Sequence, residues 1–242
     1  MGLSWPEVLA RLSRREALTA TEAEETLGVV LAGDATPAQV GAFLTLLHAK
    51  GETADEVTGL ARAMLDAAVP CPLGVDEGTV VVDLVGTGGD RLASFNVTTL
   101  AALIVAGSGV PVCKHGNRAA SSAVGTADVL EVRGDGTGAF ELHDWRVDPA
   151  QLGLGPATLA DLRGGDATFN AGVIRSVLEG EQGARRDIGV LNAAAALVVA
   201  GRVEDVASGL EVAAESVDSG RAAKVLDAMV ATSQAARRQE TG

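Results

Sequence analysis

Two short loops hold most of the residues whose types could bind an anion. The first follows the apolar run at 80–85 and has glycines at positions 86, 88 and 89. Glycine lets the backbone approach an anion closely, and successive N–H groups in such a turn form an anion-binding concavity. Asn96 then begins a helix whose N-terminus carries partial positive charge. A phosphate site and an ordinary glycine turn with a helix cap explain this spacing about equally well.

Side chains after the first loop add oxygen atoms to the same region. Thr98 and Thr99 fall in the first turn of the expected helix, where their hydroxyls could donate to a phosphate or ligate a magnesium ion. Asp90 could accept a hydrogen bond from a sugar hydroxyl or from a metal-bound water. These side chains suit a phosphorylated sugar.

The second loop, KHGNRAASS at 114–122, brings positive charge. Lys114, one of only three lysines in the chain, and Arg118 flank His115 at the end of a short apolar run. Taken singly, Arg118 reads as a surface charge and His115 as an ordinary loop histidine. Two cations opposite a glycine turn suit a ligand with several phosphates, so both loops together favour a binding site.

The elements around these loops follow a strand–loop–helix order. The β-branched runs at 80–85 and 110–114 predict buried strands, and helices are expected after each loop, over 96–107 and 118–130. Two such units in succession predict a parallel α/β sheet whose ligand lies at the carboxyl ends of the strands.

The first 70 residues have a different sequence pattern, which is typical of helices. Three capping boxes, Thr19 with Glu22, Thr36 with Gln39 and Thr53 with Glu56, each predict a helix start. Apolar residues recur between them at three- and four-residue steps, as in packed amphipathic helices. We expect a small helical domain over 1–70 and an α/β domain over 71–242, with the C-terminal helices free to join the first.

The rest of the chain is mostly helical in pattern. The segment 131–148 is partly alternating and could form a hairpin strand. Helices are expected again from 156, with a break at Gly164 and Gly165 and a new start at Asn170. The run at 186–201 predicts a buried helix, and a last helix is expected over about 220–236.

Composition excludes several classes of protein. A formal net charge of -13 disfavours a nucleic-acid surface, and aromatic residues at 2% disfavour base stacking. The sequence has no long apolar stretch and no signal-like N-terminus. We therefore expect no membrane or export segment, which favours a cytoplasmic location. Cys71 and Cys113 have no metal-ligand spacing and are expected to be buried thiols.

Three motifs carry a resemblance to a known family. DLVGTGGD at 83–90, NVTT at 96–99 and KHGNRAASS at 114–122 resemble the phosphoribosyl pyrophosphate signatures of the anthranilate phosphoribosyltransferases of tryptophan biosynthesis. The likeness continues before them in GDATPAQVGAFLTLLHAKGET and after them in GGDATFNAGVIRSVLEGEQGARRDIGVLNAAAAL. Pyrimidine nucleoside phosphorylases share the architecture but usually carry serine at the position of His115, so they are a distant alternative.

The resemblance implies an activity and a set of site residues. It implies transfer of the phosphoribosyl group to anthranilate with Mg²⁺, by a homodimer of helical and α/β domains with a cleft between them. Lys114 and Arg118 would act in catalysis, and Thr98 would hold a magnesium ion. The implied substrate-binding residues are Gly86, Gly89, Asp90, Ser94, Asn96, Val97, Thr98, Thr99, Lys114, His115, Gly116, Asn117, Arg118, Ala119, Ala120, Ser121, Ser122 and Thr126.

The chain departs from the family after VLE at 129–131. A long central block of the family is missing before the segment FELHDWRVDPAQLGL, and with it an arginine that contacts anthranilate and an Asp-Glu pair that ligates magnesium. The sheet is therefore expected to be shortened, with apolar surface left uncovered. Our hypothesis is reduced or absent transfer. A non-catalytic binding remnant and a poorly folding deletion are the alternatives.

Overall fold

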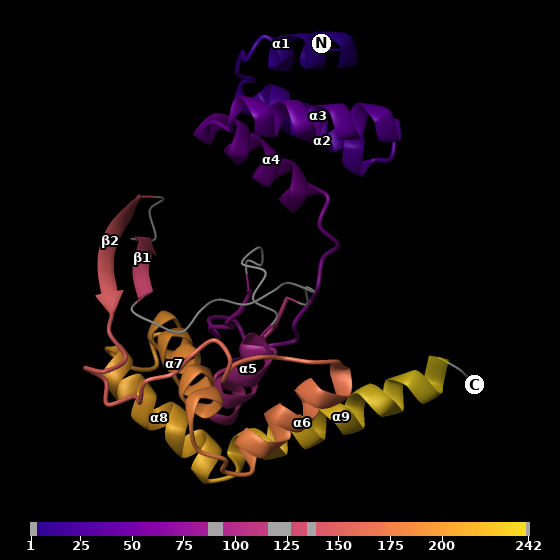
Figure 1. Cartoon of the computed structure of the whole chain (residues 1–242). Coiled ribbons are helices and arrows are strands. Elements are labelled where there is room, and N and C mark those ends of the chain that lie inside the picture. Colours follow the sequence, from indigo (N-terminus) through magenta and orange to yellow (C-terminus); the bar gives the residue numbers. More distant parts are fainter. Residues whose placement is uncertain (1–3, 87–93, 116–126, 135–138, 241–242) are drawn as a thin grey trace. The chain divides into compact units, whose positions relative to one another are not determined.

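The computed structural model describes residues 4–86, 94–115, 127–134 and 139–240. The chain forms two compact units, residues 1–74 and 75–242. The described part of the first unit is helical, and that of the second combines helices with a two-stranded hairpin (Figure 1). A helical domain followed by an α/β domain with a short sheet is the predicted fold class, which is confirmed.

Capping boxes define the helices of the first unit. These helices are α1 (Trp5–Ser13), α2 (Ala20–Leu31), α3 (Pro37–Lys50) and α4 (Ala54–Asp66). The three predicted boxes are present, and a fourth, Ser4 with Glu7, begins α1. Helix α1 packs on α3 and α2 on α4. Phe43 is fully buried in the core. The ring of Trp5 packs edge-on against it, with 6.2 Å between the two ring centroids.

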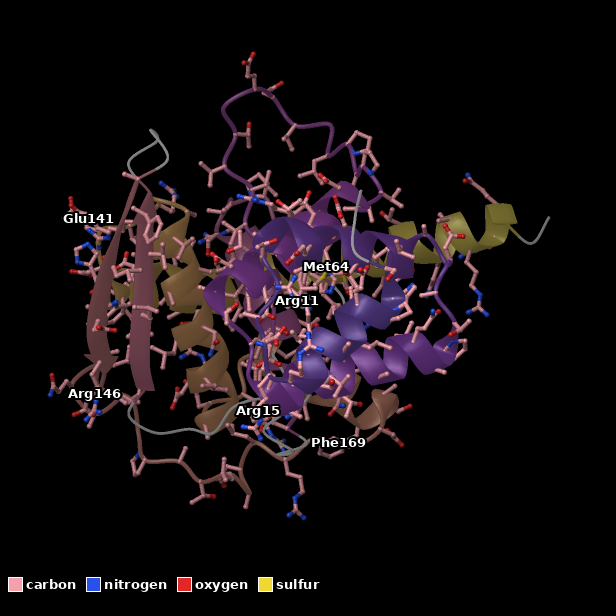
Figure 2. All side chains as sticks on the ribbon, turned by 90° about the horizontal axis from the view of Figure 1, so that it is seen from above. Arg11, Arg15, Met64, Glu141, Arg146 and Phe169 are labelled. Carbon is pink, nitrogen blue, oxygen red and sulfur yellow. The ribbon has the colours of Figure 1, made fainter. Side chains whose placement is uncertain are left out.

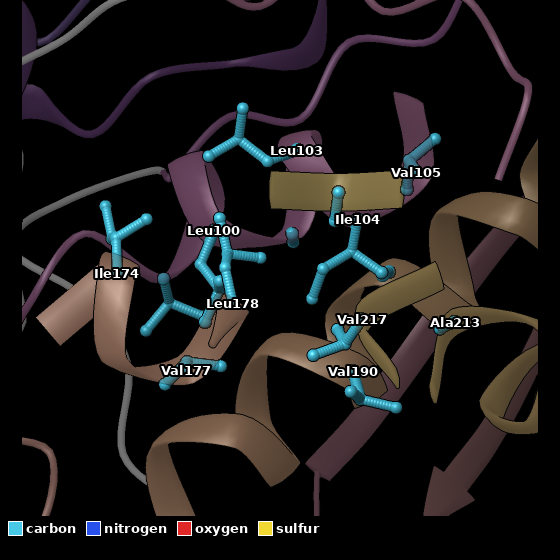
Figure 3. Packing of buried hydrophobic residues seen from close by; sticks show 14 of the residues in the cluster. Leu100, Leu103, Ile104, Val105, Ile174, Val177, Leu178, Val190, Ala213 and Val217 are labelled. Atoms are coloured by element: carbon cyan, nitrogen blue, oxygen red, sulfur yellow. The ribbon is translucent and has the colours of Figure 1, made fainter. Parts of the chain in front are cut away.

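Helix α5 (Val97–Gly107) is the centre of the second unit. Leu100, Ala101, Ile104 and Val105 are all fully buried, as expected for a helix with neighbours on several sides. The helices around it are α6 (Ala167–Leu178), α7 (Ala184–Val199), α8 (Val206–Asp218) and α9 (Arg221–Glu240). Figure 3 shows side chains of α5 meeting those of α6, α7 and α8.

Backbone carbonyls in the last turn of α5 accept hydrogen bonds from side chains far along the chain. Ser216 on α8 donates its hydroxyl to the carbonyl of Ile104 at 2.8 Å, and the guanidinium of Arg221 donates to the carbonyl of Gly107 at 2.9 Å. The Gly107 carbonyl ends the helix, where an intrahelical donor is missing, and the Ile104 carbonyl also accepts from the amide of Ser108 at 2.9 Å. This fixes α5, and with it the residues at its N-terminus.

The parallel pairing of the second unit is short. Within the described residues it consists of a bridge between Val82 and Val112, in which the amide of Val82 donates to Pro111 and that of Cys113 to Val82, each at 3.0 Å. The runs at 80–85 and 110–114 are thus paired in parallel, as predicted, over fewer residues than a regular strand. The expected burial is wrong for most of their length, since Val80 and Val85 are each more than half exposed.

The regular strands form an antiparallel hairpin, β1 (Ala127–Gly134) and β2 (Phe140–Val147). The expected helix over 118–130 is wrong at 127–130, where β1 pairs with β2; the rest of that range is largely outside the described residues. Leu130, Val132, Leu142 and Phe140 share one face and are each more than half exposed. Figure 2 shows Glu141 pointing into solvent.

Three other expectations need correction. The segment from 154 to 166 holds turns rather than a helix, and α6 begins at Ala167, after Asp166 caps it, rather than at Asn170. Cys71 and Cys113 are exposed, because the first lies in an irregular segment and the second in a segment paired on one side. Among the described helices, none is long and apolar enough to cross a membrane.

Candidate functional site

The N-terminus of α5 is organised by Asn96. Its side-chain oxygen accepts a hydrogen bond from the amide of Thr99 at 3.0 Å and from the hydroxyl of Thr98 at 3.1 Å. Asn96 is therefore the predicted N-cap of α5. Asn96 is exposed and Thr98 and Thr99 are half-buried, whereas Val97 is buried and belongs to the core. The cap presents two polar side chains at the positive end of the helix dipole.

Gly86 lies against this first turn. A methyl group added to Gly86 would be 3.8 Å from the side-chain methyl of Thr98, which is ordinary van der Waals contact. The end of the extended segment 82–86 is thus next to the start of α5. This is the strand–loop–helix arrangement predicted from the sequence. Gly89 and Asp90, in the loop between them, lie outside the described residues.

The second loop begins beside the same extended segment. The amide of His115 donates to a carboxylate oxygen of Asp83 at 2.8 Å, and the ammonium group of Lys114 donates to the carbonyl of His115 at 2.8 Å. Lys114 is half-buried and His115 is exposed. The backbone of His115 is therefore held at both its amide and its carbonyl.

The remaining predicted residues of the second loop fall in the undescribed range 116–126. They are Gly116, Asn117, Arg118, Ala119, Ala120, Ser121, Ser122 and Thr126. The described part of the predicted site consists of Gly86, Ser94, Asn96 to Thr99, Lys114 and His115. Segment 82–86 lies next to the first turn of α5 and is hydrogen-bonded to the start of the second loop, so it links the site residues of α5 with Lys114 and His115.

A distant segment supports the entry to α5. The amide of Phe95 donates to Leu162 at 3.0 Å, and Ser94 pairs with Arg163 in an antiparallel bridge. Gly164 has no room for a side chain, because an added methyl group would lie 2.6 Å from the carbonyl oxygen of Ser94. Sequence reasoning read Gly164 only as a chain break. Its close approach to Ser94 explains the glycine.

Asn170 and Arg185 hold the turn that follows. The side-chain amide of Asn170 accepts from the amide of Gly165 and donates to its carbonyl, each at 3.0 Å. Arg185 lies over the ring of Phe169 and donates to the carbonyl of Asp161 at 3.0 Å. Sequence reasoning read Asn170 only as a helix start, and assigned no role to Arg185 or to Asp83, which begins the motif DLVGTGGD.

No metal-ligand cluster stands out in the part of the chain that the structure describes. There, no group of three or more histidine, cysteine, aspartate or glutamate side chains could hold a metal ion. In proteins Mg²⁺ commonly takes several of its ligands from a bound anion and from water.

Comparison with known proteins assigns both units. The helical bundle domain model of a glycosyl transferase family matches residues 6–68, and the a/b domain model of the same family matches residues 78–136 and 134–223. The second match is interrupted between β1 and β2. This is where the sequence departs from the family pattern.

Curated relatives agree along nearly the whole chain. An anthranilate phosphoribosyltransferase of Rhizobium rhizogenes is 33% identical, with 93% of this chain and 97% of the relative covered. One of Beijerinckia indica is 34% identical, with 93% and 96% covered. The first alignment spans 331 positions, more than the 242 residues of the chain, so long stretches of the relative have no counterpart here.

Solved structures show the same fold. The anthranilate phosphoribosyltransferase of Thermus thermophilus superposes with a TM-score of 0.77 at 25% identity, covering 93% of this chain and 98% of that one. The anthranilate phosphoribosyltransferase of Saccharomyces cerevisiae in complex with PRPP (phosphoribosyl pyrophosphate) and Mg has a TM-score of 0.73 at 18% identity, covering 92% of this chain and 96% of that one. This likeness supports the fold alone. The domain matches and the relatives together show that this chain belongs to the anthranilate phosphoribosyltransferase family.

Proposed function

We propose that the chain binds phosphoribosyl pyrophosphate at the N-terminus of α5 and transfers its phosphoribosyl group to anthranilate, in tryptophan biosynthesis. One observation carries the proposal. Segment 82–86 lies beside Thr98 at Gly86 and holds the amide of His115 through Asp83, so the start of α5 and the start of the loop at 114–122 are adjacent to one short segment. Two anion-binding features that meet at one segment suit a substrate with phosphates at both ends.

The described residues have distinct roles in this proposal. The N-terminus of α5, fixed by the Asn96 cap, provides amides and a positive dipole for a phosphate. Lys114 turns from the carbonyl of His115 toward the pyrophosphate when the substrate arrives. Arg118, outside the described residues, completes the positive charge. We propose that the other residues expected from the resemblance to bind substrate also contact phosphoribosyl pyrophosphate or anthranilate.

Mg²⁺ fits this site as an ion carried in with the substrate. The hydroxyl of Thr98 donates to Asn96, which leaves its oxygen lone pairs available as a ligand. Pyrophosphate oxygens and water would complete the coordination, in keeping with the lack of an acidic cluster among the described residues. When bound, the ion supplies charge neutralisation of the departing pyrophosphate.

The chemistry needs positioning more than proton transfer. The amine of anthranilate attacks the anomeric carbon, the bond from that carbon to the pyrophosphate oxygen breaks, and the amine loses a proton to solvent. The protein holds both substrates in line and stabilises negative charge on pyrophosphate through helix amides, Lys114 and Arg118. No covalent nucleophile is required.

The missing block predicts slow transfer. The family's arginine and Asp-Glu pair have no counterpart in this chain, and losing one oriented electrostatic group costs about 10²–10³ in rate at comparable sites. We therefore propose transfer at a rate well below that of full-length relatives.

A non-catalytic binding protein is the second candidate. Two features of the described residues favour it: they contain no acidic metal cluster, and their only parallel pairing is the bridge between Val82 and Val112. Such a protein would keep phosphoribosyl pyrophosphate affinity without turnover.

We also propose a homodimer formed through the helical unit, in the cytoplasm. The helical unit exposes large apolar side chains, among them Leu31, Leu44, Met64 and Leu65, which are each between 46% and 74% exposed. Apolar side chains of this kind are suited to an interface between subunits.

The experiment that tests the proposal is pyrophosphate release with and without anthranilate. Anthranilate-dependent release supports the transferase. Calorimetric binding of phosphoribosyl pyrophosphate with Mg²⁺ but no release would replace it with the binding protein, and no binding by a cooperatively melting protein would contradict both.

A further inference from the structure

The hydrogen bond between Asp83 and His115 interrupts a regular pattern. In a parallel ladder, a residue paired with residue j receives from the amide at j+1 and donates to the carbonyl at j-1. Val82 follows this rule with its partners at 111 and 113. Continued in register, the ladder would run next from the amide of Leu84 to the carbonyl of Cys113, and then from the amide of His115 to the carbonyl of Leu84. That amide donates instead to the Asp83 carboxylate at 2.8 Å.

We infer that Asp83 is a positioning residue, which fixes the start of the cationic loop relative to the glycine turn; the inference rests on the transferase proposal. The carboxylate takes the place of a backbone acceptor at the point where the two extended segments diverge toward their loops. Val82 and Leu84, on either side, are packed in or against the core, so the segment that carries Asp83 is itself anchored.

The bond has two consequences for the ligand. First, the His115 amide is occupied, so anion binding by the second loop falls to side chains and to amides further along. Second, Lys114 precedes the held peptide, and its ammonium group already contacts the His115 carbonyl. Fixing that peptide fixes the origin from which the Lys114 side chain reaches a phosphate. Asp83 acts through Lys114 and does not touch the substrate.

The test compares the wild-type protein with the variants Asp83→Ala and Asp83→Asn. Asparagine keeps a side-chain oxygen that can accept from the His115 amide, whereas alanine does not. Losing a hydrogen bond to a charged acceptor predicts a rise in KM for phosphoribosyl pyrophosphate on the order of tenfold in Asp83→Ala, with a smaller change in kcat. Asp83→Asn should recover most of that rise.

The matched control is Asp205→Ala. Asp205 also accepts from a backbone amide at 2.8 Å, that of Ser208, but it caps α8 and is not part of the proposed site. Its loss should lower the melting temperature and leave KM unchanged. A rise in KM of the same size in Asp205→Ala and Asp83→Ala would overturn the inference, because general destabilisation would then explain both.

Amide hydrogen exchange of His115 separates this inference from the proposed function. We expect a protected amide in wild type and in Asp83→Asn, and faster exchange in Asp83→Ala, whether or not the protein turns over. Equal exchange in all three forms would refute the positioning role. If wild type binds without turnover, the dissociation constant for phosphoribosyl pyrophosphate with Mg²⁺ replaces KM. If it does not bind at all, the exchange result alone decides.

Discussion

Glu56 is the residue whose replacement should most destabilise the helical unit. It is fully buried, and one carboxylate oxygen accepts from the Lys50 ammonium at 2.7 Å, from the Thr53 amide at 2.8 Å and from the Thr53 hydroxyl at 2.9 Å. The other oxygen accepts from the Leu18 amide at 3.0 Å. The Lys50 side chain is only 5% exposed. Glu56 therefore joins the start of α4, the end of α3 and the segment before α2.

Glu56→Gln keeps the size of the side chain but cannot keep these bonds. One carboxylate oxygen becomes an NH₂ group, which must face either the Leu18 amide or the group of donors from Lys50 and Thr53. Breaking a buried ion pair by removing one partner costs about 3–5 kcal/mol, because the other charge stays buried and unpaired. We expect a loss of unfolding free energy in that range.

Glu22→Gln is the matched control. Glu22 occupies the same capping-box position in α2 and is paired with a cation, Arg11, at 2.7 Å, but their side chains are 24% and 26% exposed. Partly exposed pairs are worth about 0.2–1 kcal/mol. Urea unfolding followed by Trp5 fluorescence, in a Trp145→Phe background, reports this unit. Equal losses in the two variants would refute the reasoning about burial.

The hydrogen bonds around Glu56 also predict how the stability of the helical unit depends on pH. Burial by itself raises the pKa of the Glu56 carboxyl, but hydrogen bonds from Lys50, Leu18 and Thr53 together lower it below its usual value of 4.5. A carboxyl with a lowered folded pKa contributes stability above its unfolded pKa and loses it as pH falls through the folded one. Stability of the helical unit should therefore be level near neutral pH and decline below about 4.5, and this decline should be smaller in Glu56→Gln.

Three further predictions concern the α/β unit. Asn96→Ala should lower unfolding free energy by about 1 kcal/mol through loss of the cap, whereas Asn96→Asp should keep the cap but weaken phosphoribosyl pyrophosphate binding by repulsion; melts and calorimetry measure the two effects. Gly189→Ala should cost about 1–3 kcal/mol, because the added methyl group would overlap Leu100 on α5, while Gly172→Ala, where nothing lies within 4 Å, should be neutral or stabilising; urea unfolding followed by Trp145 fluorescence, in a Trp5→Phe background, measures both. Thr98→Ala should raise the Mg²⁺ concentration needed for half-maximal binding, and Thr98→Ser should not; an unchanged requirement in Thr98→Ala would exclude Thr98 as a ligand.

Features encoded by neighbouring residues were predictable from the sequence. The capping boxes and the Asn96 cap depend on residues three apart, and the structure has them where the spacing placed them. Helix α8 also had such a signal, because Asp205 precedes apolar positions 206, 210, 213 and 217, but sequence reasoning did not use it. The contact between Gly86 and Thr98 follows from the predicted strand–loop–helix unit.

Features decided by distant partners were not predictable. Residues 127–130 fit a helical pattern, yet they form a strand because β2 offers a row of backbone partners. The exposure of Cys113 depends on how many strands cover its segment, and one partner is not enough. Asp83 looks like an ordinary strand residue in sequence. Its role depends on where a loop 32 residues away begins.

The most direct test of the central claim is loss of anthranilate fluorescence on mixing purified protein with phosphoribosyl pyrophosphate and Mg²⁺, beside a Lys114→Ala control. The account predicts slow turnover that disappears in the control. Absence of turnover in a cooperatively folded protein, or turnover that persists in Lys114→Ala, would contradict it. Turnover as fast as that of a full-length relative would instead show that the missing block is dispensable, which the account does not allow.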